Sequence, residues 1–352
     1  MIKKIVALLL IFIFTCGCTF HKKSKEVVNN TEVLPLMSTQ SNAENRVWVG
    51  TFQLVWNDLM DYIIKAPIKF VGGTPDVVNE LNKQDFKAEY LSESSYYKTY
   101  GKASPDLKKQ IIQGIKEKFN ETSDIVNSID WSPAKGKYVV YAMLKKDFKF
   151  LEPFDKLNPE KFGKNEEKVD YFGIDRNSDY KLHKNVSVLF YNSPDDFAVK
   201  LHTQGDDVVY LYRTDDDKPF NQFYDDIIAK SESYSGSKYF NDVDRLKIPD
   251  IKLYNEKHFK ELCDRQIDGT DLAIADAIET IDFKMNNEGV KLKSEAVIIT
   301  KLTSIGPGHR VEPRYFYFTD NFVLFLQEKD KSKPYFALKA ADISEINKTG
   351  KK

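Results

Sequence analysis

The side chains best suited to covalent or metal chemistry are few in this 352-residue chain, which holds three cysteines and five histidines. The histidines stand singly, without the close spacing to other His, Cys or acidic residues that a metal site needs; they are His21, His183, His202, His258 and His309. There is also no glycine-rich phosphate loop, no Cys-x-x-Cys and no Gly-x-Ser-x-Gly. We therefore predict that the protein is not an enzyme and holds no metal or cofactor.

Two of the cysteines, Cys16 and Cys18, lie at the end of an apolar N-terminal segment. Lys3 and Lys4 precede an apolar run, residues 5–14, and Thr15-Cys16-Gly17-Cys18 follows. This order is typical of a secretory signal peptide, and the run is about half as long as a membrane-spanning helix. The last four residues resemble a lipobox, in which a cysteine after a small residue is acylated and becomes the new N-terminus. Gly17 favours cleavage after residue 17 and lipidation of Cys18, with Cys16 as the alternative.

A lipidated Cys18 predicts a protein anchored to the cell membrane or outer membrane on its extracytoplasmic face. The remaining cysteine, Cys263, has no partner for an internal disulfide, so stability must come from burial. The apolar fraction of 41% is enough for a sizeable core. A formal net charge of −1 lacks the basic excess of nucleic-acid-binding proteins, and we predict no nucleic-acid partner.

The rest of the chain divides by composition. Residues 18–46 are polar and predict a flexible tether, residues 47–345 a single α+β domain, and residues 346–352 a polar tail. Helical spacing from residue 52 to residue 63 and the helix start Ser104-Pro105-Asp106 predict a mainly helical N-terminal part. Further helices are expected at residues 220–228 and 258–265.

Strand patterns dominate from residue 138 onward. The nearly continuous apolar run of residues 138–144 predicts a strand buried on both faces. Alternating patterns predict half-buried strands at residues 197–201, 208–212, 248–253 and 315–326. Gly205-Asp206-Asp207 predicts a hairpin turn between the first two of these.

Several of these segments, taken in order, resemble parts of the serpin (serine protease inhibitor) family. The stretch Ile281–Gly289 resembles the serpin segment that leads from the central sheet into the reactive loop. The other matches are residues 138–155 (third strand of the main sheet), 199–212 (a hairpin), 248–253, 320–327 and 331–338. Tyr141 and Phe150 depart from the family pattern, which has a buried Asn and a Trp at these places.

The resemblance implies a large central mixed or antiparallel sheet, smaller sheets and an exposed reactive loop that a protease cuts. The cut loop of a serpin inserts into the central sheet as a new strand. Glu288 and Gly289 would form the hinge, and the side chains that follow alternate in strand fashion. Val290, Leu292, Ser294, Ala296 and Ile298 point one way and are apolar or small, whereas Lys291, Lys293 and Glu295 point the other way. Insertion would therefore bury no charge.

Family spacing places the scissile bond near Thr303-Ser304, with Lys301-Leu302 and Leu302-Thr303 as alternatives. The expected partner is a target serine or cysteine protease, and the protein is expected to be a monomer. Leu292, Lys291 and Lys293 are bulkier than the small residues of inhibitory relatives, which leaves an alternative open. In that alternative the chain is a non-inhibitory binding or scaffold lipoprotein of the cell envelope.

Overall fold

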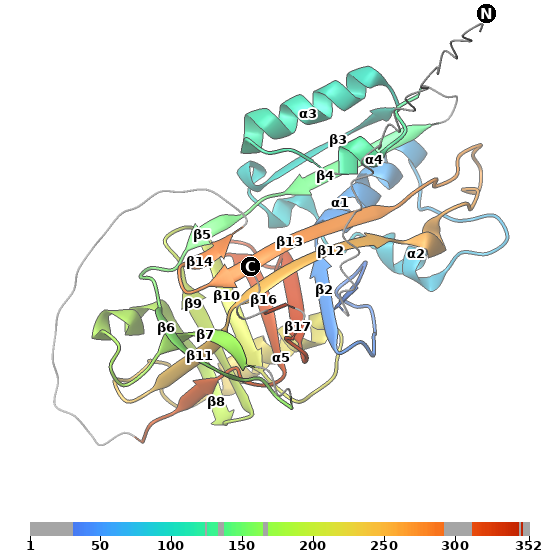
Figure 1. The fold of residues 1–352 in the computed structure, drawn as a ribbon. Coiled ribbons are helices and arrows are strands. Elements are labelled where there is room, and N and C mark those ends of the chain that lie inside the picture. The colour runs from blue at the N-terminus through green and yellow to red at the C-terminus, as the bar shows by residue number, and fades with distance from the viewer. Residues whose placement is uncertain are drawn as a thin grey trace, which may run out of the picture.

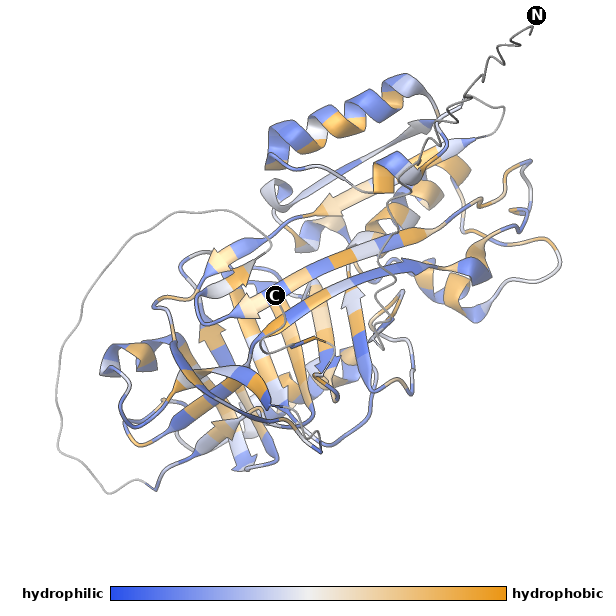
Figure 2. Cartoon of the chain, viewed as in Figure 1, coloured by the Kyte–Doolittle hydropathy of each residue, from blue (hydrophilic) through white to orange (hydrophobic). Residues whose placement is uncertain are grey.

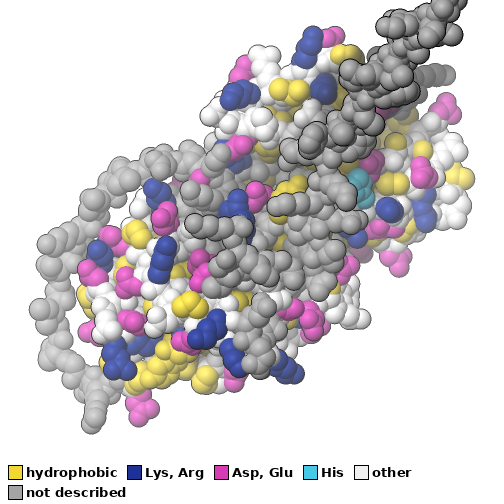
Figure 3. Space-filling model, in the orientation of Figure 1, with side chains coloured by type: hydrophobic (Ala, Val, Ile, Leu, Met, Phe, Trp, Pro, Cys, Tyr) yellow, Lys and Arg dark blue, Asp and Glu magenta, His cyan; other side chains and the backbone are white. Residues whose placement is uncertain are grey.

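The computed structural model describes residues 31–123, 125–132, 137–164, 168–291, 312–344 and 346–347. Within these residues, no helix is both long and apolar enough to cross a membrane. Figure 1 shows a strand-rich α+β molecule, as the sequence predicts. Lys and Arg side chains are interspersed with Asp and Glu over the face drawn in Figure 3.

The largest sheet has seven strands and forms the centre of the core. Its order is β1-β2-β17-β16-β10-β9-β8, all antiparallel except the parallel pair β1–β2. Every residue of β16 is buried, because it has a strand on each side and covered faces. Figure 2 shows these strands as predominantly apolar. The strands are β1 (Thr31–Val33), β2 (Asn45–Val49), β8 (Val186–Ser193), β9 (Asp196–His202), β10 (Asp207–Arg213), β16 (Phe322–Glu328) and β17 (Phe336–Ala340).

Helix α5 (Phe220–Ser233) packs its aromatic residues on the large sheet. Phe220 meets Phe325 edge to face with ring centroids 6.1 Å apart, and Phe223 meets Tyr212 at 6.3 Å. A second sheet, of four strands, has the order β15-β11-β7-β6. Its strands are β6 (Asp155–Lys161), β7 (Lys168–Ile174), β11 (Arg245–Pro249) and β15 (Tyr315–Tyr317).

A third sheet, β12-β13-β14-β5, lies beside a separate strand pair, β3–β4. Its strands are β5 (Asp147–Lys149), β12 (Ile251–His258), β13 (Ile278–Asn286) and β14 (Gly289–Lys291), and the pair consists of β3 (Tyr96–Lys102) and β4 (Tyr138–Leu144). In Figure 1 the pair and β12–β13 run alongside each other with β5 and β14 at one end. We call β3–β4 together with β12–β13 the split sheet.

The remaining helices surround the split sheet. Helix α3 (Pro105–Phe119) begins at Ser104, whose hydroxyl accepts a hydrogen bond from the Leu107 amide, and covers β3 with its apolar face. Together with β4, α3 encloses a small core of its own, separate from the main one. The other helical elements are α1 (Thr51–Asp58), a π-helical turn at Leu59–Ile64, α2 (Asp76–Leu81), α4 (Ile125–Ser128) and four 3-10 turns at Ala88–Tyr90, Glu93–Ser95, Tyr180–Asn185 and Lys260–Leu262.

The domain begins earlier and ends later than the sequence predicts. We expected a flexible tether through residue 46, but β1 and β2 already belong to the large sheet. Arg46 is 1% exposed, and its charge is balanced by Asp217, 2.7 Å away. At the other end, Ile346 and Asn347 are buried, although both lie in the expected polar tail. Polar residues in these two segments form ion pairs or hydrogen bonds with residues far away in the sequence. Composition alone therefore misplaces both ends of the folded domain.

Two element predictions are also wrong. The segment 138–144 is a strand, but it has one neighbouring strand among the described residues and is mostly half-exposed rather than buried on both faces. Residues 258–265 contain the end of β12 and one 3-10 turn instead of a helix. The N-terminal part is mainly helical, as predicted, although it also supplies β2 and β3. The hairpin at residues 205–207 and the helix at 220–228 are also confirmed.

Candidate functional site

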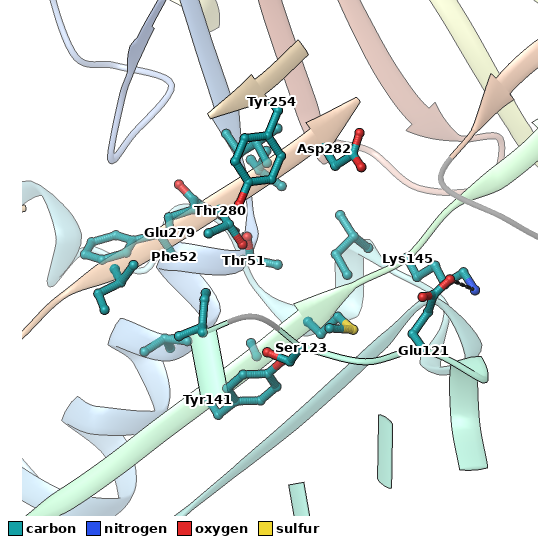
Figure 4. Close-up of a pocket in the computed structure, with 18 of the residues that line it drawn as sticks. Thr51, Phe52, Glu121, Ser123, Tyr141, Lys145, Tyr254, Glu279, Thr280 and Asp282 are labelled. Atoms are coloured by element: carbon teal, nitrogen blue, oxygen red, sulfur yellow. Dashed lines mark hydrogen bonds and ion pairs between the residues drawn. The ribbon is translucent and has the colours of Figure 1, made fainter. Parts of the chain in front are cut away.

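Two strand edges without partners face each other in the split sheet. On one side β13 pairs with β12 along its whole length, but on the other it pairs with β14 only at Lys284–Asn286. Strand β4 pairs with β3, and its opposite edge meets no strand among the described residues. Between the two edges lies a cavity of about 490 Å³, lined by residues of both strands. We call it the gap. Its two walls are visible in Figure 4.

The walls of the gap are apolar in the middle and charged at one end. Phe52 and Val55 of α1 and Phe336 of β17 contribute apolar side chains, together with residues 141–144 of β4 and 278–282 of β13. Glu121 and Lys145 form an ion pair of 3.0 Å on the β4 side, and Asp282 lies on the β13 side (Figure 4). An extended chain with an apolar face fits such a space, because open strand edges offer backbone hydrogen bonds.

Strand β14 already occupies one end of the space between the two strand pairs. Val290 pairs with Met285 of β13 on one side and with Phe148 of β5 on the other. Val290 is fully buried, which agrees with the face predicted for it. Continued in the same register, the chain after Lys291 would run between residues 278–283 of β13 and the β4 edge. The gap is therefore the direct continuation of β14.

Gly289 lets β14 enter between its neighbours. A Cβ atom at this position would lie 2.2 Å from the Phe148 carbonyl oxygen and 2.7 Å from the Lys149 Cα atom. Both are backbone atoms of β5 and cannot rotate away, so only glycine permits this approach. Glu288 is exposed, and its carbonyl accepts a hydrogen bond of 3.0 Å from the Phe150 amide. The predicted hinge residues thus lie where β14 begins.

A buried carboxyl group sits in the wall of the gap on β13. Glu279 is 4% exposed, and its Oε1 atom accepts a hydrogen bond of 2.7 Å from the Thr51 hydroxyl. Its Oε2 atom is buried without a hydrogen-bond partner among the described residues. Burial raises the pKa of Glu279 to about 8, against the opposing effect of the Thr51 hydroxyl and the Phe52 amide. The side chain is therefore mostly a neutral acid at pH 7.

A second buried polar cluster fixes the joint between β4 and β5. The Lys146 ammonium contacts Glu328 at the end of β16 and lies 2.9 Å from Asp207 at the start of β10. Glu328 also accepts hydrogen bonds from the Ser92 amide and the Ser95 hydroxyl, just before β3. The Lys146 ammonium holds the pKa of Glu328 below its usual range against the effect of burial. The cluster ties the β3–β4 pair to the large sheet.

Sequence analysis did not single out Glu279 or Lys146. A signal for Glu279 existed: the buried positions of β13 alternate, and Glu279 shares their face with Ile281, Phe283 and Met285. A charged residue on the buried face of a strand is a recognisable exception. Lys146 carried no such signal, because Glu328 lies 182 positions away in the chain.

Most of the predicted site residues lie outside the described residues. Glu288, Gly289 and Val290 are described, as above. Strand β14 pairs with β13 in the third sheet and has no place in the large sheet. Because β12 and β13 also form half of the split sheet, the sheet that the loop was expected to leave is the split sheet. The predicted lipidation site and most of the loop positions fall on residues that the structure does not describe: Cys18, Leu292, Ser294, Ala296, Lys301, Leu302, Thr303 and Ser304.

Comparison with known proteins finds similarity in solved structures. No protein-family model matches the chain, and no curated protein sequence does. The chain is similar to Serpin48, described as a highly specific serpin of the insect Tenebrio molitor, at 14% identity and a TM-score of 0.48, over 84% of this chain and 91% of that one. It is also similar to human thyroxine-binding globulin in complex with thyroxine, at 10% identity and a TM-score of 0.41, over 67% and 64% of the two chains.

These similarities are to solved structures with TM-scores below 0.5. At this level of identity they establish neither an activity nor a binding partner for the chain. What the protein does must therefore be inferred from its own geometry.

Proposed function

We propose that this chain is a divergent serpin that inhibits a serine or cysteine protease by inserting its cleaved loop into the gap. The observation that carries the proposal is the position of β14, which pairs with β13 and β5 and leads directly into the gap. Two open strand edges in register with a strand that has already entered are what a strand-insertion mechanism requires. The inhibitor would be consumed in the reaction and is not an enzyme.

Filling the gap would stabilise the protein in two ways. Each backbone hydrogen bond made to β13 or β4 contributes about 1 kcal/mol net. Side chains on the buried face would add apolar burial at about 25 cal/mol per Å². Extending the register of β14 places residue 292 opposite Phe283, residue 294 opposite Ile281 and residue 296 opposite Glu279. These are Leu, Ser and Ala, so no charge enters the buried face.

The decisive experiment incubates the protein with a panel of serine and cysteine proteases, followed by denaturing gels. Inhibition predicts a covalent complex that survives denaturation, and a cleaved form that melts at a higher temperature than the intact protein. Cleavage near residues 301–304 without complex, and without a rise in melting temperature, would exclude the mechanism.

A pair of glycine variants makes the test specific to the gap. Gly289→Val should abolish both the complex and the rise in melting temperature, because the new side chain collides with the backbone of β5. Gly205→Val serves as the control, since a Cβ atom there meets nothing within 4 Å. If both variants behave alike, entry through β14 is not the route.

A non-inhibitory binding or scaffold lipoprotein remains the second candidate. It is favoured by Leu292, whose bulk would slow insertion relative to hydrolysis of the acyl-enzyme. For this candidate the gel shows cleavage alone, and the cleaved chain melts at the same temperature as the intact protein.

We further propose that the protein is held to a membrane on the extracytoplasmic side through a lipid on Cys18. The support is the sequence of residues 1–18. Metabolic labelling with radioactive palmitate in a bacterial host tests it directly. Cys18→Ser should abolish labelling and release the protein, whereas Cys16→Ser should leave both unchanged. The reverse result would place the lipid on Cys16.

A further inference from the structure

We propose that Glu279 is a proton-dependent gate on the gap: a strand enters the gap readily only while this carboxyl group carries its proton. The inference rests on the proposed insertion of a strand and adds the condition that regulates it. Its basis is the position of one acidic side chain on the buried face of β13, at the place where the partner strand is missing.

The geometry makes Glu279 sensitive to the filling of the gap. Its Oε1 atom is held by the Thr51 hydroxyl at the start of α1, whereas Oε2 has no partner among the described residues. Glu279 of β13 and Ala142 of β4 both line the gap, and the registers of β14 with β13 and β5, if continued, place position 296 between them. The extended register of β14 places the alanine of position 296 next to the carboxyl group. An alanine side chain has no hydrogen-bond donor. An inserted strand would therefore exclude water from the Glu279 carboxyl group without donating a side-chain hydrogen bond to its Oε2 atom.

Few charged groups face Glu279 from the surrounding elements. Lys257 is its cross-strand partner on β12, and Lys257 lies 5.9 Å above the Phe259 ring. On β4 the titratable group that lines the gap is Tyr141, which packs in the small core under α3 and whose pKa burial raises to about 12. The Glu121–Lys145 pair and Asp282 also line the gap. None of these groups contributes to the shift of Glu279, which arises from burial and is opposed only by Thr51 and Phe52.

The direction of the pH dependence follows from burial. Burial already raises the pKa of Glu279 to about 8 while the gap is open. A strand in the gap would exclude water further and raise the pKa again, because desolvation disfavours the charged form. Filling is therefore independent of pH below about 8. Above that value it must take up a proton, and its equilibrium constant falls by up to tenfold per pH unit.

The test measures entry of a probe strand as a function of pH. A fluorescent synthetic peptide with the sequence of residues 292–303 is titrated with the protein from pH 6 to pH 9.5. For the wild type we expect constant affinity up to about pH 8 and a loss of roughly tenfold per unit above it. Glu279→Gln, which keeps the shape but cannot ionise, should bind with the same affinity throughout. The exposed Glu261→Gln should retain the wild-type slope. Melting curves at pH 6 show whether each variant folds, and Glu279→Leu serves as a second non-ionising variant.

The outcomes separate the gate from the proposed function. Binding with the same pH profile in wild type, Glu279→Gln and Glu279→Leu would overturn the gate and leave insertion standing. Absence of peptide binding to every variant at every pH would overturn insertion, and the gate with it. A slope that disappears in both Glu279 variants and persists in Glu261→Gln establishes the gate.

Discussion

The large sheet and the split sheet are built from similar strands but differ in what their edges meet. In the large sheet β16 has a partner on both sides, and all seven of its residues are buried. Among the described residues of the split sheet, β4 and β13 each have one partner over most of their length, and a cavity of about 490 Å³ lies between them. The first arrangement satisfies its backbone groups and is rigid. The second has two strand edges with no strand partner among the described residues, so a further strand can be added there.

The largest expected difference between the two regions is in amide hydrogen exchange. The amides of β16 lie between two partner strands and should exchange only by global unfolding, whereas those of β13 that point into the gap have no strand partner among the described residues. We expect protection to differ by about a thousandfold or more, as between global and local opening. Exchange measured by mass spectrometry on peptides covering residues 322–328 and 278–283 tests this. Equal protection would mean that the gap is closed in solution.

Truncating one side chain in each region should give the next largest contrast. Phe325→Ala removes a fully buried ring from β16 and should lower the free energy of unfolding by about 3–5 kcal/mol. Met143→Ala changes a half-buried residue beside the gap and should cost about 1 kcal/mol. Chemical denaturation of both variants measures the two values. A larger loss for Met143 would contradict the ranking.

The ionic cluster that joins the two regions gives a third test. Lys146→Met leaves Glu328 and Asp207 buried without their cation and should destabilise the protein by about 3 kcal/mol. The exposed pair Lys83–Glu80 is the control, and Lys83→Met should leave the stability nearly unchanged, because solvent screens this pair. Chemical denaturation of the two variants under the same conditions measures both changes in the free energy of unfolding. A neutral Lys146→Met would show that the cluster does not fasten the β4–β5 joint.

The smallest expected effect concerns Asp250, at the link between β11 and β12. Burial, and next the nearby Asp170, raise the pKa of Asp250 to about 6, with Lys156 opposing. The folded state thus favours the protonated acid, so its stabilising contribution is complete below about pH 4 and is lost as the pH rises through 6. Because the site is partly exposed, we expect a loss of about 1–2 kcal/mol. Asp250→Asn should remove this slope from denaturation curves between pH 4 and pH 7, and an unchanged slope would assign it to another group.

Local patterns predicted the parts of the fold that depend on neighbouring residues. Alternation and Gly205 gave the β9–β10 hairpin, and Ser104 gave the start of α3. At the site, the sequence pointed to Gly289 and to the buried face of Val290. These features depend on interactions between residues a few positions apart in the sequence, or on the two-residue period of a strand.

Sheet membership and the long-range partners could not be predicted in this way. The apolar run of β4 suggested burial on both faces, but its apolar side chains serve the small core under α3 and the wall of the gap. Arg46 sits in a polar segment that folds because Asp217, 171 positions away, balances its charge. Such pairings depend on the tertiary arrangement, which single-sequence periodicity does not contain.

The first strand of the fold has a mechanical consequence. Strand β1 forms the edge of the large sheet through three parallel pairs with β2, and the Asn255 side chain of β12 donates a hydrogen bond of 2.7 Å to the Thr31 carbonyl. Tension applied at the N-terminal end is thus divided between the large sheet and the β12–β13 half. A pull at this end would load the β12–β13 wall of the gap through this hydrogen bond.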